Sequence, residues 1–220
     1  MYPCQKENLK LSITTNPYTV KNETSLINRL FDEGLDALHV RKPKINEIDM
    51  KKFINEIDPE YHHKLVLHTH YTLVNQFDID KIHLGHDWVF NFATEMYLNM
   101  VTLKGKKVSK SMTITNCAPL YIPVKGINEF LLGPIFARFS YMTDKQLIKS
   151  EVLEKALRHS KLPVSAMGGV STETLEFFKN IGFQGVNMQS SIWKSTDPVA
   201  AFAEIRDHYT ATTQTLRIAV

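Results

Sequence analysis

The 220-residue sequence lacks the features that mark membrane, secreted or nucleic-acid-binding proteins. It has no run of about 18 or more apolar residues, so no membrane-spanning helix is predicted. Its first ten residues, MYPCQKENLK, contain no apolar core of a signal peptide. The formal net charge is only +3 and the basic residues are scattered, which argues against nucleic acid as a partner.

Cysteine is also scarce, because Cys4 and Cys117 are the two in the chain and they form no CxxC pair. This usage predicts free thiols and a cytoplasmic protein rather than a disulfide scaffold. Hydrophobic residues make up 43% of the sequence and charged residues 22%, which is ordinary for a globular protein. We therefore expect residues 1–220 to form a single domain.

The first predicted strand is followed by TTNPYT, which contains no glycine. An open doubly wound sheet usually has a glycine-rich loop there, so this competing fold is disfavoured. Short apolar runs instead alternate with segments of helical period, which predicts parallel strands covered by helices. Eight such units in a chain of this length predict an α/β fold, a (β/α)8 TIM barrel.

The eight strands are predicted at residues 10–15, 37–41, 64–68, 81–85, 106–111, 129–133, 162–169 and 185–189. Helices are predicted at residues 25–34, 50–57, 71–77, 91–103 and 149–160, around Leu175, Phe178 and Ile181, and at residues 197–209.

Two glycines, Gly168 and Gly169, directly follow the seventh predicted strand, and Gln189 and Ser190 follow the eighth. In (β/α)8 barrels the loops after these two strands often bind a phosphate group. Glycine allows main-chain N–H groups to approach a phosphate closely, and a helix start adds further donors. We therefore expect a phosphomonoester at these four residues. The alternative is a tight turn that requires glycine for its geometry alone.

Polar residues recur at alternate positions of three central strands, and alternate strand residues face the same side. The set predicted to face the lumen comprises His39, Arg41, Val66, His68, His70, His83 and Gly85. Arg41, with Lys42 and Lys44 beyond it, would form a cationic wall for a phosphorylated ligand.

Five histidines, His39, His68, His70, His83 and His86, come from three neighbouring strand ends. Neutral imidazole binds zinc and similar ions, so a metal site is one interpretation. Polar lining or hydrogen bonding to a ligand is the other, because the spacing matches no fixed metal motif and Asp87 is the one carboxylate among them.

Several motifs, in order, resemble the thiamin phosphate synthase superfamily with its thiazole tautomerase (TenI) branch. They are ALHVRKP, KIHLG, EFLLGPIFARFS, VSAMGGVS and GVNMQSSIW. The segments GLDALHVRKP and LVLHTH especially resemble a Bacteroidetes-type subgroup of the family. The resemblance covers almost the whole chain and implies a (β/α)8 barrel. It also implies transfer of hydroxymethylpyrimidine from its pyrophosphate to thiazole phosphate, with release of pyrophosphate.

The resemblance implies small phosphorylated heterocycles as substrates, Mg²⁺ as cofactor, and a homodimer in some members. The catalytic residues expected from it are Arg41, His68, Lys110 and Ser111. The residues expected to bind substrate are His39, Lys42, His70, Gly133, Ser140, Gly168, Gly169, Gln189 and Ser190. Trp88, Phe136, Phe139 and Tyr141 are candidates for stacking on a heterocycle or for packing at the rim.

The chain departs from the family pattern at its catalytic positions. Thr69 and Trp88 stand where the family has Mg²⁺-binding aspartates, and a threonine does not replace a carboxylate toward a hard cation. Tyr141 stands in the place of a family lysine, and no histidine follows the fifth strand as in the tautomerase branch. Three hypotheses remain: a synthase with a divergent pyrophosphate site, a tautomerase-like acid/base enzyme, and a non-catalytic binder of thiazole phosphate or thiamin phosphate.

Overall fold

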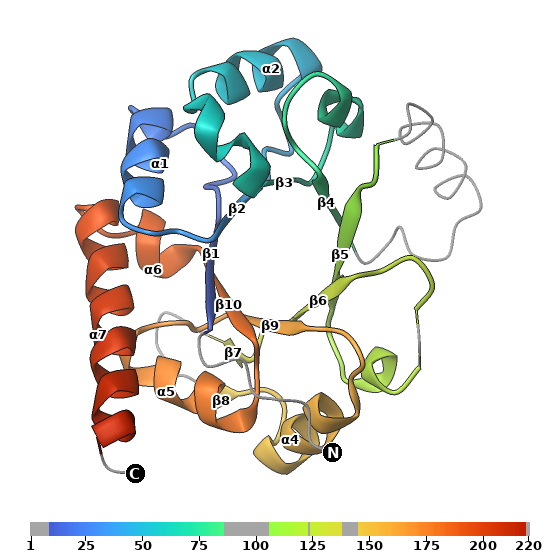
Figure 1. Cartoon of the computed structure of the whole chain (residues 1–220), viewed down its shortest axis with the longest axis vertical. Coiled ribbons are helices and arrows are strands. Elements are labelled where there is room, and N and C mark those ends of the chain that lie inside the picture. The colour runs from blue at the N-terminus through green and yellow to red at the C-terminus, as the bar shows by residue number, and fades with distance from the viewer. Residues whose placement is uncertain (1–8, 86–105, 123, 138–144, 219–220) are drawn as a thin grey trace.

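The computed structural model describes residues 9–85, 106–122, 124–137 and 145–218. The described strands form one closed parallel barrel with the order β1-β10-β9-β6-β5-β4-β3-β2 (Figure 1). The barrel strands are β1 (Lys10–Thr14), β2 (Ala37–Val40), β3 (Leu65–Leu67), β4 (Lys81–Leu84), β5 (Ser109–Ile114), β6 (Glu129–Leu132), β9 (Val164–Met167) and β10 (Gly185–Met188). The predicted (β/α)8 fold is therefore confirmed.

Helices surround the barrel on its outer side (Figure 1). The α-helices are α1 (Glu23–Asp32), α2 (Glu47–Asn55), α4 (Ser150–His159), α5 (Thr172–Ile181), α6 (Ser190–Trp193) and α7 (Pro198–Ile218). Short 3₁₀ helices are η1 (Pro59–Lys64), η2 (Tyr71–Asn75) and η4 (Ala118–Leu120). The connections after β3 and β5 thus contain 3₁₀ turns among the described residues, where the sequence predicted an α-helix after β3.

Two further predictions differ from the structure or lie beyond it. The fifth strand was predicted at residues 106–111 but runs from Ser109 to Ile114, because its pairing with β4 begins at Ser109 and its pairing with β6 continues to Ile114. The helix predicted at 91–103 lies outside the described residues. A two-stranded sheet of β7 (Phe136–Ala137) and β8 (Lys145–Gln146) was not predicted.

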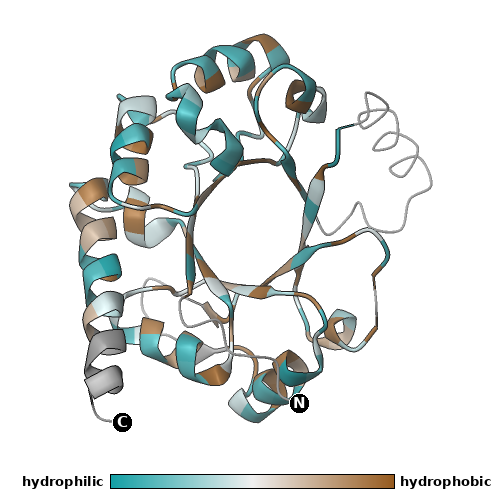
Figure 2. Cartoon of the chain, in the orientation of Figure 1, coloured by the Kyte–Doolittle hydropathy of each residue, from teal (hydrophilic) through white to brown (hydrophobic). Residues whose placement is uncertain are grey.

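The apolar core is a ring between the strands and the surrounding helices. Ile13, Leu38, Leu65 and Val186 point outward from four strands into this ring and are fully buried. Residues at the intervening positions point into the lumen, and hydrophilic and hydrophobic residues alternate along strands such as β1 (Figure 2), whereas β3 is apolar throughout. The alternation read from the sequence therefore assigns the two faces correctly.

The C-terminal helix α7 packs on the outside of the barrel near its first strand. Helix α7 packs against α1, α5 and α6. The main-chain N–H of Leu9 donates a hydrogen bond of 2.5 Å to the hydroxyl oxygen of Tyr209, and Arg206 pairs with Glu33, which directly follows α1. Cys117 is a buried, free thiol, as predicted, whereas Cys4 lies outside the described residues.

Candidate active site

Three histidines meet in the barrel lumen. His39 lies on β2, His83 on β4, and His68 immediately follows β3, so three neighbouring strands bring them together. His39 Nδ1 lies 3.1 Å from His68 Nε2, and the rings of His68 and His83 stack with centroids 4.2 Å apart. His39 and His83 are buried and His68 is half-buried. The sequence predicted this convergence from strand alternation.

The environment keeps these imidazoles uncharged. Burial lowers the pKa of His39 and of His68 well below the ordinary value, and repulsion between each of them and a protonated His83 lowers both further. Burial, with a smaller effect of the Arg41 guanidinium, lowers the pKa of His83 to about 4. Neutral histidines accept hydrogen bonds, carry protons and bind metal ions, so the cluster is equipped for these three kinds of chemistry.

Two hydroxyl groups of β5 orient His83. Its Nδ1 lies 2.9 Å from Ser111 Oγ and its Nε2 lies 2.8 Å from Thr113 Oγ1. The hydroxyl of Ser111 is also placed to donate to the carbonyl oxygen of Ile82 at 3.4 Å. Ser111 Oγ then accepts from His83 Nδ1–H, which leaves the Nε2 lone pair facing Thr113. Ser111, predicted as a catalytic residue, therefore contacts the histidine cluster, while Thr113 was missed.

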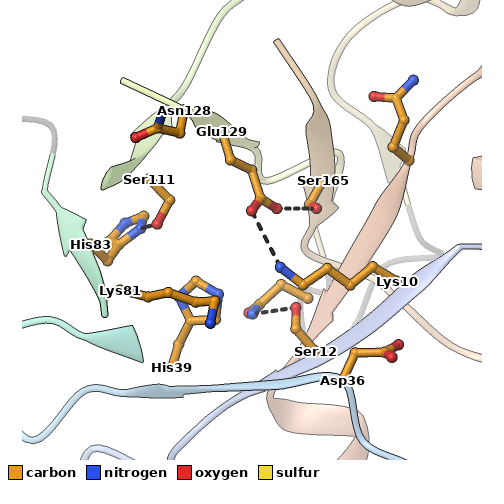
Figure 3. A network of polar contacts seen from close by, with 12 residues as sticks. Lys10, Ser12, Asp36, His39, Lys81, His83, Ser111, Asn128, Glu129 and Ser165 are labelled. Atoms are coloured by element: carbon orange, nitrogen blue, oxygen red, sulfur yellow. Dashed lines mark hydrogen bonds and ion pairs between the residues drawn. The ribbon is translucent and has the colours of Figure 1, made fainter. Parts of the chain in front are cut away.

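A polar network that the sequence analysis missed spans the lower lumen, at the N-terminal ends of the strands (Figure 3). Lys10 Nζ lies 3.4 Å from a carboxylate oxygen of Glu129, and Ser165 donates to the other oxygen at 2.8 Å. Ser12 accepts from the side-chain amide of Asn187 at 3.0 Å. Alternation within β6 places Glu129 and Leu131 on the lumen face, so the signal was present in the sequence.

Arg41 and Lys42 have different surroundings. Arg41 follows β2 at the mouth, is exposed, and lies close enough to His68 and His83 to affect the pKa of both. Lys42 instead is buried, and its Nζ donates to Glu23 at 2.5 Å and to the carbonyl oxygens of Asn16 and Tyr18. These three bonds use all three ammonium donors, so the structure does not support Lys42 as a substrate-binding residue.

Two other predicted residues lie apart from the cluster. Lys110 is the second residue of β5 and pairs in register with Ile82, whose side chain belongs to the outer core. Lys110 is therefore at the N-terminal end of its strand and on the face away from the lumen, which contradicts the predicted catalytic role. His70 adopts a left-handed backbone conformation, and its Nε2 lies 2.9 Å from the carbonyl oxygen of Ile45 rather than in the lumen.

Gly168 and Gly169 are required by the backbone and by close packing. Their φ angles are +89° and +73°. A Cβ at Gly168 would lie 2.7 Å from Pro134 Cβ, and one at Gly169 would lie 2.4 Å from Phe136 Cβ. Gly133, at the end of β6, is confined in the same way by the carbonyl oxygen of Met167.

Phe136 packs in the rim beneath this turn. Its ring makes edge-to-face contacts with Phe177 and Phe178. Packing is thus the role that the geometry gives to Phe136, the second of the two interpretations offered from the sequence. The tight glycine turn is real, and it also exposes main-chain donors.

Main-chain N–H groups gather at the ends of β9 and β10, which are neighbours in the barrel. Met167 pairs with Asn187, so Gly168 and Gly169 lie beside the start of the segment from Gln189 to Ser191. Within the described part of the chain, the N–H groups of these five residues donate to no acceptor. The predicted phosphate cradle therefore has adjacent loops and unused donors, while the binding itself stays a prediction.

Two side-chain bonds fix the loop after β10 to the end of β1. Gln189 Nε2 donates to the carbonyl oxygen of Thr15 at 3.2 Å, and Trp193 Nε1 donates to that of Thr14 at 2.7 Å. The side chain of Gln189 thus has a structural partner, which leaves its main chain for a ligand. Ser190, the first residue of α6, is exposed.

The described residues do not fit the magnesium ion that the family resemblance implied. The described loops that directly follow the barrel strands contain no aspartate or glutamate. Thr69 Oγ1 is buried without a hydrogen-bond partner among the described residues. Magnesium prefers carboxylate oxygens, whereas the donors gathered here are imidazole nitrogens. Other predicted site positions lie outside the described residues: Ser140, His86, Asp87, Trp88, Phe139 and Tyr141.

The fold and the lumen define a (β/α)8 barrel with polar groups at the C-terminal strand ends, where such barrels carry their chemistry. The chain belongs to the thiamine monophosphate synthase family, whose model matches residues 11–192. It is 23% identical to a thiamine-phosphate synthase of Dictyoglomus thermophilum over 190 residues, which cover 84% of this chain and 82% of that protein. Membership of this family supports a role in thiamin biosynthesis.

Solved structures agree on the fold. The chain is similar to a thiamine phosphate pyrophosphorylase from Bacteroides thetaiotaomicron, with a TM-score of 0.71, 23% identity, and coverage of 91% of this chain and 97% of that one. A thiamine phosphate pyrophosphorylase from Pyrococcus furiosus gives a TM-score of 0.72 at 19% identity, with 92% and 96% covered. Among the described residues, no helix is both long and apolar enough to cross a membrane.

Proposed function

We propose that this chain is a thiamin phosphate synthase with a divergent pyrophosphate site. It would join the hydroxymethylpyrimidine group of a pyrophosphate ester to thiazole phosphate and release pyrophosphate. The observation that carries the proposal is the set of unused main-chain N–H groups at the adjacent ends of β9 and β10, in a chain of this family. These donors suit the phosphate of the thiazole substrate.

The reaction consists of one bond broken and one bond formed. The C–O bond between the pyrimidine methylene and pyrophosphate breaks, and its electron pair leaves with the pyrophosphate oxygen. The thiazole ring nitrogen then donates its lone pair to the resulting methylene cation and becomes positively charged in thiamin phosphate. Such a step depends on stabilising the negative charge of the leaving group.

Arg41 is the residue that we assign to the leaving pyrophosphate. Arg41 is exposed, directly follows β2, and lies close enough to His68 and His83 to affect the pKa of both. In the barrel, only β1 separates β2 from the cradle strand β10. A guanidinium binds phosphate oxygens through paired, charge-assisted hydrogen bonds. Lys44 follows on the same loop and is exposed, whereas Lys42 and Lys110 are removed from this group by their positions in the structure.

The test supplies both phosphorylated precursors to the purified chain and measures thiamin phosphate and pyrophosphate. We expect both products in equal amounts, with Mg²⁺ and Mn²⁺ tested in parallel. Absence of product under all conditions would exclude synthase activity. Calorimetry with thiazole phosphate then distinguishes a non-catalytic binder, which retains phosphate-dependent binding, from a chain that binds neither precursor.

A second candidate is an acid/base enzyme of the tautomerase kind, and the histidine cluster favours it. A neutral imidazole at the mouth can accept a proton from a bound thiazole and return it elsewhere on the ring. His68 is the cluster member with partial exposure. Thiazole aromatisation that is lost in His68→Gln but retained in the exposed His63→Gln control would support this candidate, and equal rates in both would exclude His68 as the proton carrier.

A further inference from the structure

The three lumen histidines bring one ring nitrogen each into the same small region of the lumen. One ring nitrogen from each of His39, His68 and His83 can be chosen so that all three lie within 4.8 Å of one another. The closest pair is His39 Nδ1 and His68 Nε2, at 3.1 Å. In a tetrahedral site with metal–nitrogen distances near 2.0–2.1 Å, two ligand nitrogens lie about 3.3 Å apart. This pair therefore already has the separation of two ligands on one ion.

We propose that His39, His68 and His83 bind one transition-metal dication of the zinc class, with a fourth position open toward the barrel mouth. Three histidines with an open position form a known type of reactive zinc site. Imidazole nitrogen also suits cobalt and nickel, but not magnesium. The proposal rests on the histidine geometry and not on the proposed function.

His83 is oriented for this role by its partner on β5. In the tautomer that carries the proton on Nδ1, Ser111 Oγ accepts from this N–H at 2.9 Å, and Nε2 is the nitrogen with the lone pair. Histidine ligands usually donate their other N–H to an oxygen in this way. Nε2 now faces Thr113 Oγ1 at 2.8 Å, and binding exchanges that hydroxyl for the ion. To bind the ion, the His83 ring must turn out of its stack with His68. The nitrogens now lie up to 4.8 Å apart, so the widest separation must shorten by about 1.5 Å to reach the separation in a tetrahedral site.

Charges around the cluster decide how strongly an ion is held. Arg41 lies near His68 and His83, and Lys10 lies near enough to His39 to act on it, so both oppose a cation. Lys10 is compensated by Glu129, while Arg41 is exposed and screened by solvent. An anion bound at the mouth would neutralise Arg41 and so reduce its repulsion of the ion.

The experiment titrates tag-free, chelator-treated full-length protein with Co²⁺ and follows the visible absorption of the metal. We expect one equivalent per chain, the intense spectrum of a four-coordinate ion, displacement by Zn²⁺, and no displacement by Mg²⁺. Each of His39→Gln, His68→Gln and His83→Gln should weaken binding at least about 100-fold, and Ser111→Ala about 10-fold. Circular dichroism checks that each variant is folded.

His63→Gln and His70→Gln are the matched controls. His63 is exposed, and His70 bonds to the carbonyl oxygen of Ile45 outside the cluster. Both should bind cobalt as the parent does. The proposal is overturned if the parent chain binds no stoichiometric cobalt or zinc, or if binding survives in all three cluster variants. Because no substrate is present, this result is independent of whether the chain has synthase activity.

Discussion

The Lys42 ammonium lies 2.5 Å from a carboxylate oxygen of Glu23, and both side chains are almost fully shielded from water, with exposures of 7% and 5%. Burial raises the pKa of the Glu23 carboxyl, although the hydrogen bond and charge of Lys42 oppose this effect. The pair links the loop after β2 to the first turn of α1, and Lys42 also holds two carbonyl oxygens of the loop after β1. Lys42 therefore shapes the barrel mouth instead of facing it.

Lys42→Met should destabilise the chain by about 3–5 kcal/mol, because it leaves the buried Glu23 carboxylate without its counter-charge. Urea unfolding of the parent and the variant measures this loss. The double variant Lys42→Met with Glu23→Gln should recover part of it. Lys52→Met, which breaks an exposed pair with Asp49, is the control and should change stability by no more than about 1 kcal/mol. Equal effects of Lys42→Met and Lys52→Met would contradict this account of the pair.

Gly169→Ala should both destabilise the chain and remove phosphate binding. The positive φ costs about 1–2 kcal/mol for alanine, and the contact of the new Cβ with Phe136 adds about 1–3 kcal/mol of overpacking. Gly34→Ala is the matched control, because Gly34 has a φ of +93° and no atom within 4 Å of an added Cβ. Calorimetry with inorganic phosphate should show binding to Gly34→Ala and to the parent, and much weaker binding to Gly169→Ala. Unchanged phosphate affinity in a folded Gly169→Ala would argue against the cradle.

Acid should destabilise the fold through the lumen histidines. The pKa of His83 is about 4 in the folded chain and near its ordinary value of 6.5 when unfolded. The unfolded state therefore binds more protons between these values, and the free energy of unfolding falls as the pH decreases from 6.5 toward 4. Between neutral pH and about pH 4.5, the parent should lose about 2–3 kcal/mol more than His83→Gln, which has no group to protonate. Parallel stability curves for the two proteins would show that His83 does not titrate in this way.

Arg41→Met should weaken inorganic pyrophosphate binding about 10- to 100-fold, since hydrogen bonds between charged groups contribute about 1.5–3 kcal/mol. Phosphate binding at the cradle should change little, because that site uses main-chain donors. Arg29→Met on the exposed face of α1 makes the same change in charge away from the mouth. Competitive binding measurements on the three proteins provide the comparison. An equal loss in Arg29→Met would mean that net charge, and not the position of Arg41, determines the affinity.

Strand alternation in the sequence predicted the barrel and the faces of its central strands. Leu38 and Val40 point outward and His39 inward as the pattern requires. The same alternation places Lys42 on the outward side, with Leu38 and Val40. The prediction that Lys42 forms a cationic wall at the mouth was therefore inconsistent with this pattern. Glu23, its partner, stands 19 positions earlier, and a pairing over that distance is not visible in local periodicity.

Side-chain contacts between neighbouring strands could not be predicted from the sequence, because they depend on the register in which the strands pair. The bond between His83 and Ser111 requires the two residues to pair directly across β4 and β5. A shift of one residue would have placed Lys110 in the lumen and Ser111 outside it. The fifth strand was predicted three residues too early, which left this register undetermined. Lys110 was included as a positive charge for the pyrophosphate, and charge alone does not show which face of the strand a residue occupies.

The barrel has two buried regions, the apolar layer between strands and helices and the partly polar lumen. The apolar layer beneath the helices supplies most of the favourable free energy of folding, whereas the lumen also contains polar side chains that hydrogen-bond to one another, such as Ser12 with Asn187 and Glu129 with Ser165. Changes in the lumen can therefore accumulate without loss of the scaffold, provided that each new polar group finds a partner. Such a chain could exchange oxygen ligands for nitrogen ligands over evolutionary time and still close the same cylinder.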